Sequence, residues 1–192
     1  RRNRVSDVYT PSGKVQLWLR PLDAPISTPI AGTENGVLPF WSPDGRSIGF
    51  FADKKLKRID LGGGSPLNLY DVDGVGGAWT PNGDILFAGP AGPILRLPAS
   101  GGAAAPVTKL DAARGETAHR YPFLLPDGKH FLYFSRCAND ESNGIFVGSL
   151  DGGEPKFLMP SKVRASFLKS SSESDKGYLI FERDKALMAQ HF

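Results

Sequence analysis

The sequence is poor in residues that would cross-link the chain or carry it through a membrane. It has a single cysteine, Cys137, which excludes an intramolecular disulfide and a zinc site made from cysteines. It has no run of about 18 apolar residues, the length of a membrane-spanning helix. A secretory signal peptide is not recognisable either. We therefore expect no membrane span within these 192 residues.

A sustained helical period is missing as well. No segment keeps apolar residues at intervals of about 3.6 positions. Only 109–119 suggests a helical turn, and Gly115 argues against a longer one. The chain instead has 23 glycines and 16 prolines, which stand between short apolar runs as turn residues do. This composition predicts an all-β protein with many short strands.

The net charge is mild, at +3, with a pI of about 9.0. Basic residues are densest in 54–58, which we read as a solvated strand and turn, with a surface for an anionic partner as the alternative. Aromatic residues are not interleaved with a basic face, so nucleic-acid binding is not expected. No metal or cofactor is expected, because Asp140 and Glu141 match no known calcium loop and the histidines are scattered.

The chain repeats itself. The segment WSPDGRSIGFF (41–51) is matched by WTPNGDILFAG (79–89) and LLPDGKHFLYFS (124–135), and more loosely by SSESDKGYLIFER (171–183). Each places a turn of the Pro-Asp-Gly type before an apolar strand, because proline presets φ, Asp or Asn tolerates unusual φ, and glycine accepts positive φ. A second motif, a strand followed by paired glycines as in LKRIDLGGGSP (56–66), comes after each turn.

The repeat has a period of about 38 to 50 residues, which leaves room for four strands in each unit. Four strands in about 40 residues is typical of a β-propeller blade. We therefore predict an all-β propeller of four-stranded antiparallel blades with about four repeats. The predicted division of a single domain over 1–192 is a partial blade 1–36, blades 37–75, 76–115 and 116–162, and a partial blade 163–192.

These motifs resemble the TolB-like (PD40) propeller repeat over nearly the whole chain. The segments QLWLRPLD (16–23), LPFWSPDGRSIGFFADKKLKRIDLGGG (38–64) and HRYPFLLPDGKHFLYFS (119–135) more narrowly resemble the propeller region that follows the kinase domain in some bacterial serine/threonine protein kinases. That resemblance implies an extracytoplasmic sensor or binding platform, tethered by a membrane segment elsewhere in the protein. The same repeat occurs in TolB and beside peptidase domains, so it is specific for fold rather than function.

Propellers of this family usually have six or more blades. The chain begins without Met, with 5–30 expected to supply the third and fourth strands of a blade and 163–192 the first to third strands of another. We therefore expect an incomplete segment of a larger propeller. The alternative is a four-bladed ring, closed by pairing the N-terminal strands with the C-terminal blade.

No catalytic residue is predicted. The segment 45–49 fits the G-x-S-x-G pattern of a serine hydrolase, but its turn precedes Ser47 and a strand follows, whereas a nucleophile elbow joins a strand to a helix. The His-Arg-Asp and Asp-Phe-Gly motifs of a protein kinase are missing. The glycine-rich segments near 60–66 and 73–79 lack the Gly-Lys-Ser/Thr of a phosphate loop. We therefore expect this segment not to be an enzyme.

The segment GETAHRYP (115–122) brings polar residues into a predicted innermost strand, where other repeats have apolar or glycine-rich sequence. Glu116, His119 and Arg120 are therefore predicted to face the channel mouth, where propellers usually bind ligands. Arg164 occupies a similar place in the next repeat. Two arginines would favour a protein or a small anionic ligand. The alternative is that His119 and Arg120 only tie neighbouring blades together.

The function that these observations favour is a non-enzymatic binding or sensor propeller, the extracytoplasmic (periplasmic-side) interaction region of a bacterial serine/threonine kinase. The location follows from the resemblance alone. Two alternatives stay open. One is an accessory propeller that gates substrate to a serine peptidase domain, and the other is a TolB-like periplasmic scaffold.

Overall fold

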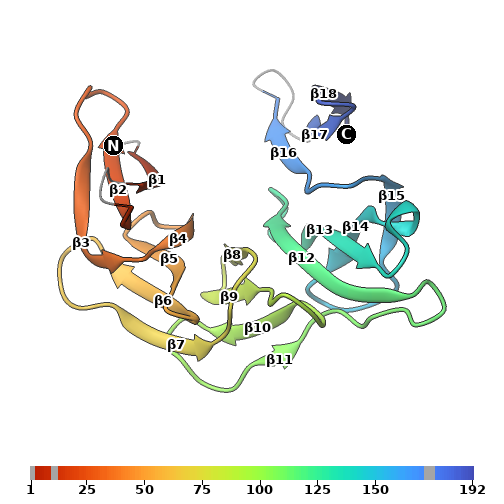
Figure 1. Ribbon diagram of the computed structural model, residues 1–192, viewed down its shortest axis with the longest axis horizontal. Coiled ribbons are helices and arrows are strands. Elements are labelled where there is room, and N and C mark those ends of the chain that lie inside the picture. Colours follow the sequence, from red (N-terminus) through yellow and green to blue (C-terminus); the bar gives the residue numbers. More distant parts are fainter. Residues whose placement is uncertain (1–2, 10–12, 171–175) are drawn as a thin grey trace. The chain divides into compact units, whose positions relative to one another are not determined.

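The computed structural model describes residues 3–9, 13–170 and 176–192. Within these ranges the chain forms strands β1 to β18 and one short 3-10 helix, η1 (Asp140–Ser142) (Figure 1). By internal packing it divides into two compact units. One comprises residues 1–85 with 97–104, and the other comprises 86–96 with 105–192.

Five sheets follow one another along the described chain. The first sheet has three strands in the order β1 (Asn3–Tyr9), β2 (Val15–Pro21) and β3 (Thr28–Glu34). The second has four strands in the order β4 (Val37–Trp41), β5 (Ser47–Ala52), β6 (Lys55–Asp60) and β7 (Leu67–Asp71). The third sheet, which contributes to both units, has four strands: β8 (Gly77–Trp79), β9 (Asp84–Phe87), β10 (Leu95–Pro98) and β11 (Ala105–Pro106).

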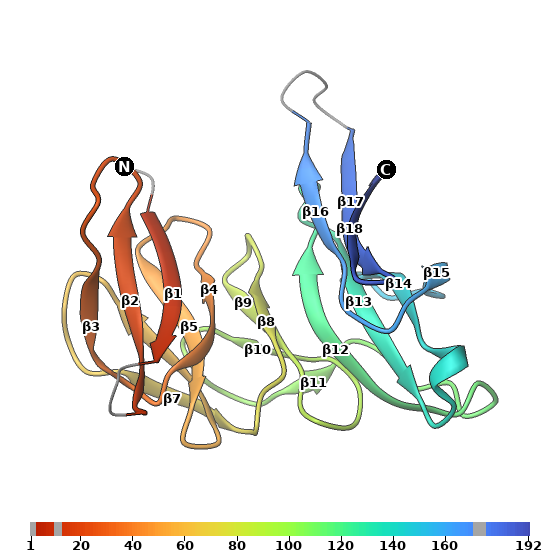
Figure 2. The same ribbon diagram turned by 45° about the horizontal axis from the view of Figure 1, so that its top comes forward.

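The remaining two sheets belong to the second unit (Figure 2). The fourth sheet has the order β12 (Glu116–Leu124), β13 (His130–Cys137), β14 (Gly144–Ser149) and β15 (Lys156–Pro160). The fifth has three strands, β16 (Ser166–Lys169), β17 (Gly177–Arg183) and β18 (Ala186–His191). Each of these two sheets is a meander in which sequence neighbours pair antiparallel.

The predicted turn chemistry is confirmed. In the turn between β4 and β5, the Gly45 N–H donates to the Ser42 carbonyl over 3.0 Å, and Gly45 has a φ of +68°. The Asp44 carboxylate accepts from the Ser42 hydroxyl and from the Arg46 N–H. The corresponding turns at 80–83 and 125–128 repeat the same backbone bond, and their glycines also have positive φ. Only a residue without a Cβ takes this conformation at no cost.

Each unit is held together by apolar side chains that the apolar strands supply. In the first unit, the first and second sheets pack around Leu17, Ile48, Phe50, Ala52 and Ile59. In the second unit, side chains of the fourth and fifth sheets form the core. Its buried members are Leu125, Leu132, Phe134, Ile145, Met159, Ala165, Leu179 and Phe181.

The predicted blade count is wrong. We expected about four repeats in an incomplete segment of a larger propeller, whereas the described residues form five blade-like sheets of three or four strands. The four-bladed alternative fails on the same count. At the N-terminus, where a partial blade with two strands was expected, the chain forms a sheet of three strands, β1, β2 and β3. The strand β1 was missed because its sequence, NRVSDVY, is largely polar and no Pro-Asp-Gly turn leads into it.

Candidate functional site

Three of the four predicted site residues, Glu116, His119 and Arg120, lie on β12, the first strand of the fourth sheet, and a bulge interrupts this strand. The register between β12 and β13 shifts between Arg120 and Phe123, where Tyr121 has a φ of +54°. The same feature recurs in β4, where Leu38 has a φ of +51° within a register shift. A bulky residue rarely takes this left-handed conformation. The bulge therefore recurs in the first strand of two of the sheets, β4 and β12.

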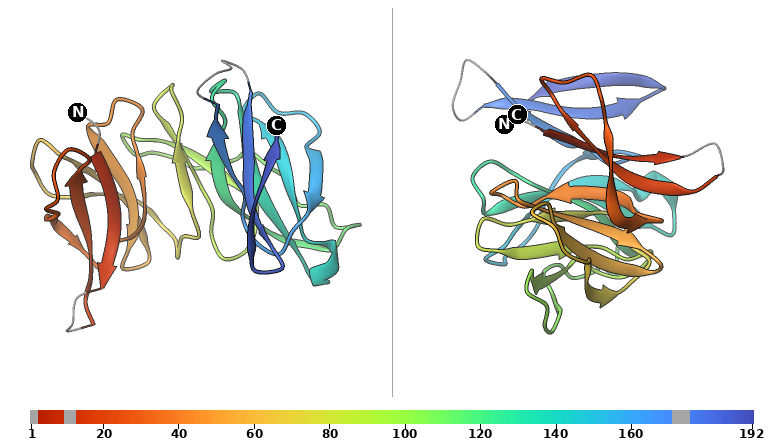
Figure 3. Two further views of the ribbon diagram at one scale, coloured as in Figure 1. Left: turned by 90° about the horizontal axis from the view of Figure 1, so that it is seen from above. Right: turned by 90° about the vertical axis from the view of Figure 1, so that its left-hand side faces the viewer.

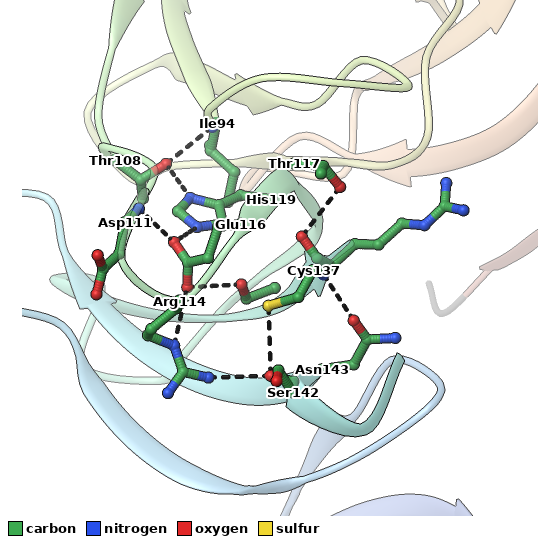
Figure 4. Close-up of polar contacts among 12 residues, drawn as sticks. Ile94, Thr108, Asp111, Arg114, Glu116, Thr117, His119, Cys137, Ser142 and Asn143 are labelled. Atoms are coloured by element: carbon green, nitrogen blue, oxygen red, sulfur yellow. Dashed lines mark hydrogen bonds and ion pairs between the residues drawn. The ribbon is translucent and has the colours of Figure 1, made fainter. Parts of the chain in front are cut away.

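A loop of the third sheet is bonded to the start of β12. Gly92 and Ala118 form an isolated parallel bridge, in which the Gly92 N–H donates to Thr117 over 3.0 Å and the His119 N–H donates to Gly92 over 2.9 Å. These backbone bonds fix His119 at the centre of a polar cluster (Figure 4).

His119 is fully buried and both of its ring nitrogens have partners. Nδ1 lies 2.8 Å from the Thr108 hydroxyl, and Nε2 lies 2.9 Å from Oε2 of Glu116. The Glu116 carboxylate can only accept, so the neutral imidazole carries its proton on Nε2 and donates it to that carboxylate. Nδ1 then accepts from the Thr108 hydroxyl, whose oxygen also accepts the Ile94 N–H over 2.9 Å.

Glu116 is almost as buried, with 4% of its side chain exposed. Besides His119, its carboxylate accepts the Asp111 N–H and the Ser135 hydroxyl, both over 2.7 Å. The Arg114 Nε lies 3.4 Å from Oε1. Each carboxylate oxygen thus faces two donors, as a buried charge requires.

The surroundings set the charge of both groups. Burial alone would raise the pKa of Glu116, but hydrogen bonds from Asp111, Ser135 and His119 bring this pKa below its usual value. Burial lowers the pKa of His119 and outweighs the opposing effect of the Glu116 charge. Burial and the Glu116 charge raise the pKa of Tyr133, whose ring centre lies 4.6 Å from that of His119. At neutral pH the cluster therefore holds a neutral histidine and an ionised glutamate.

Arg120 and Arg164 have no contact with this cluster among the interactions of the described residues. Arg120 directly precedes Tyr121 on β12, and Arg164 lies in the connection between β15 and β16. Arg120 donates from Nη2 to the Pro90 carbonyl, and its buried Nε has no partner among the described residues. Arg164 is exposed, and its guanidinium carbon lies 5.6 Å from the centre of the Tyr121 ring. The structure thus divides the four predicted residues into a buried pair and an arginine pair, and their binding role stays a prediction.

A groove of about 1200 Å³ opens beside the buried cluster. Its walls include Thr108, the loop 109–114, Phe146 and the turn 152–155. Arg114 crosses one wall, with its guanidinium 5.1 Å from the Phe146 ring centre and an Nη2 bond of 3.0 Å to the Ser142 carbonyl.

Several members of the cluster escaped the sequence prediction. Thr108, Asp111 and Arg114 stand in the connection before β12, and Ser135 stands on β13. The first three lie in 108–114, directly before the predicted segment 115–122, so a prediction that included the preceding connection would have contained them. Ser135 sits within an apolar strand and gives no such signal.

Ser47 is the first residue of β5, as predicted for a strand that follows a turn. It is buried, and its hydroxyl donates to the Asp60 carboxylate on β6. The segment after it runs as a strand through Ala52. The local match to G-x-S-x-G is therefore not a nucleophile elbow.

Two further properties bear on function. In the described ranges, no helix combines the length and the hydrophobicity that a membrane crossing needs. Within the same ranges, no three His, Cys, Asp or Glu side chains gather in a way that could hold a metal ion.

No protein-family model matches the sequence, and no curated protein is similar to it in sequence. Solved structures do match. A TolB protein of Agrobacterium tumefaciens superimposes with a TM-score of 0.70 at 19% identity, over 82% of this chain and 61% of that one. TolB from Acinetobacter baumannii gives 0.67 at 19% identity, over 98% and 52%. The chain therefore spans between half and two thirds of these proteins, and its fold is that of a TolB-like β-propeller.

Peptidase propellers are similar as well. A puromycin-hydrolysing peptidase of Mycobacterium tuberculosis matches all of this chain with 36% of its own length, with a TM-score of 0.59 at 15% identity. Identities this low establish a shared fold and carry no function with them.

Proposed function

We propose that this chain is a non-enzymatic binding propeller that receives an anionic group, carried by a protein or a small ligand, at Arg120 and Arg164. The observation that supports this proposal is the charge at the Tyr121 bulge. Neither arginine contacts a carboxylate within the described residues, whereas Arg58 and Arg114 pair with Asp60 and Glu116. Arg164 lies against the Tyr121 ring and Arg120 precedes Tyr121 on β12, and guanidinium groups without a carboxylate partner favour a carboxylate or phosphate ligand.

The proposed site is held in place before a ligand arrives. Arg164 rests against Tyr121, whose left-handed backbone conformation is fixed between Arg120 and Pro122. Arg120 is anchored through Pro90. Side chains held in this way lose little conformational freedom on binding, which favours affinity.

In this proposal Glu116 and His119 act as positioning residues. They are buried and bonded to each other, and they hold the start of β12 from which Arg120 projects. Their contribution to binding is indirect.

A more specific proposal is that this propeller is the extracytoplasmic sensor region of a bacterial serine/threonine protein kinase. Its support is the resemblance of the three quoted segments to such propellers. An accessory propeller of a serine peptidase and a TolB-like scaffold are the alternatives, and the structural similarities apply to both. The coding sequence on either side decides among them. Kinase motifs and a membrane span upstream would support the sensor, and a hydrolase domain downstream would overturn it.

The binding site itself is tested by calorimetry, in which a short oligoglutamate peptide is titrated into the chain. An oligolysine peptide of opposite charge is the negative control. We expect Arg120→Ala and Arg164→Ala each to weaken oligoglutamate binding about tenfold, the effect of losing one charge-assisted hydrogen bond. Arg136→Ala removes an exposed cation from β13 and serves as the matched control. Equal losses in all three variants, or no oligoglutamate binding at all, would contradict the proposed site.

A further inference from the structure

The sequence contains three Asn-Gly steps, at 35–36, 82–83 and 143–144. Asparagine before glycine can lose its side-chain amide, because the glycine nitrogen can attack the side-chain carbonyl carbon and no Cβ obstructs the approach. The attack needs a backbone that can move and an amide that is not held elsewhere. Because the reacting pair is the same in all three steps, the surrounding structure decides which of them reacts.

The step at 143–144 is held inside the fourth sheet. Asn143 is buried, its Oδ1 accepts the Cys137 N–H over 2.6 Å, and its Nδ2 donates to Asp140 over 3.2 Å. Gly144 begins β14 and is paired with both β13 and β15. The Gly144 nitrogen and the Asn143 amide therefore meet only when part of this sheet unfolds.

The step at 35–36 is restrained as well, although Asn35 is exposed. Its Nδ2 donates to Oδ1 of Asp53 over 3.0 Å, and its N–H donates to the Val15 carbonyl over 2.8 Å. Gly36 is buried, and its N–H donates to the Thr33 carbonyl over 2.9 Å. These three hydrogen bonds must break before this step can react.

Asn82 stands in the turn between β8 and β9, which is yellow-green in Figure 3, and lacks these restraints. Its side chain is exposed and forms no hydrogen bond with any described residue. The Gly83 N–H donates to the Thr80 carbonyl over 3.1 Å, and this bond alone holds a reacting group. The Gly83 carbonyl accepts the Ala99 N–H over 3.0 Å, which leaves the Gly83 nitrogen unaffected. A Cβ on Gly83 would meet nothing within 4 Å, so a new ring has space to form.

We propose that Asn82 is a site of spontaneous deamidation, and the only one of the three Asn-Gly steps that reacts while the chain is folded. The Gly83 nitrogen forms a bond to Cγ of Asn82. The side-chain amide leaves as ammonia with the proton of the Gly83 nitrogen, and a succinimide ring remains. Water then opens the ring at either carbonyl, which gives aspartate or isoaspartate. Each event lowers the net charge of +3 by one.

The two products differ in how they fit the turn. The corresponding turns already have aspartate before their glycine, and the carboxylates of Asp44 and Asp127 accept backbone N–H groups there. Aspartate at position 82 is therefore compatible with this turn. Isoaspartate instead adds a carbon to the main chain, inside a hairpin that the Thr80 N–H closes with the Asp84 carbonyl over 2.8 Å. The isoaspartate product should therefore loosen the pairing of β8 with β9.

The test is incubation of the folded chain in mildly alkaline buffer, followed by peptide mapping with mass spectrometry, which reports all three steps in one sample. We expect Asn82 to deamidate at least about tenfold faster than Asn35 or Asn143, because additional hydrogen bonds must break at those two. The same incubation in guanidinium chloride is the control. The three steps should react there at similar rates, since the folded structure no longer separates them.

Asn82→Asp is the matched variant, because it removes the reacting amide and keeps the residue found in the corresponding turns. Its turn peptide should no longer gain the mass of deamidation. A gain that persists in this variant overturns the proposal, since it would arise at another residue such as Asn68. A folded wild type in which Asn35 or Asn143 reacts as fast as Asn82 overturns it too. An advantage of Asn82 that persists in guanidinium chloride does the same, because the local sequence would then explain it.

Discussion

At the scale of the residue, the cluster around Glu116 makes the fold sensitive to acid. His119 is neutral in the folded chain because burial lowers its pKa from the ordinary 6.5. In the unfolded chain the His119 imidazole has its ordinary pKa. Between the pKa of the folded chain and that of the unfolded chain, the unfolded chain therefore binds more protons. The stability that neutral His119 contributes is therefore fully present above the pKa of this histidine in the unfolded chain. It is lost as the pH falls through the pKa of the histidine in the folded chain. Glu116, whose pKa is lowered from 4.5, adds a second loss in the same direction at lower pH.

We therefore expect the melting temperature to fall as the pH is lowered from about 7.5 to about 5.5, across the ordinary pKa of histidine. His119→Gln should be less stable at the higher pH, by about 1 to 3 kcal/mol for a disturbed buried hydrogen-bond pair. It should also lose part of the pH dependence, because the group that resists protonation is gone. Thermal unfolding monitored by circular dichroism at each pH measures both effects.

His130→Gln is the control, because His130 is an exposed histidine at the first position of β13. It should leave the pH dependence close to that of the wild type. A His119→Gln variant whose melting temperature follows pH as steeply as the wild type would show that His119 is not the source.

At the scale of the element, aromatic rings cover glycines on neighbouring strands. The Phe40 ring lies over Gly49, its partner in the β4–β5 register, where an added Cβ would approach ring carbons to 2.3 Å. Phe131 covers Gly148 and Phe167 covers Gly177 in the second unit. The second glycine of the apparent hydrolase motif therefore has a packing role. An aromatic ring over a strand glycine fills the space that the missing side chain leaves.

Gly49→Ala should therefore destabilise the chain by about 1 to 3 kcal/mol, the usual cost of overpacking a buried strand. Gly62→Ala is the matched control, since a Cβ there meets nothing within 4 Å. The free energies of unfolding in urea give the comparison. Adding Phe40→Leu to Gly49→Ala should recover part of the loss, and a double variant without recovery would show that the ring is not the obstacle.

At the scale of the whole molecule, the repeats predicted the class of fold and the turns that define it. The Pro-Asp-Gly turns and apolar strands carry this information locally, because they depend on backbone preference and burial. Strand β1 of the N-terminal sheet was not predicted, since its sequence is largely polar and no such turn leads into it. The sequence did not predict the burial of Glu116 and His119 either. Their partners Thr108 and Ser135 come from different segments, and pairing across segments depends on packing that a single sequence does not reveal.

The bridge between Gly92 and Ala118 makes the fourth sheet depend on a loop of the third. In repeat proteins each repeat contacts mainly its neighbours. Here the loop 88–94 supplies the backbone partner of the His119 N–H, and Pro90 in the same loop holds Arg120. A duplicate of the fourth sheet alone would lack both. Copies of this region that keep the polar cluster are therefore expected to carry the preceding loop with them, as one inherited block.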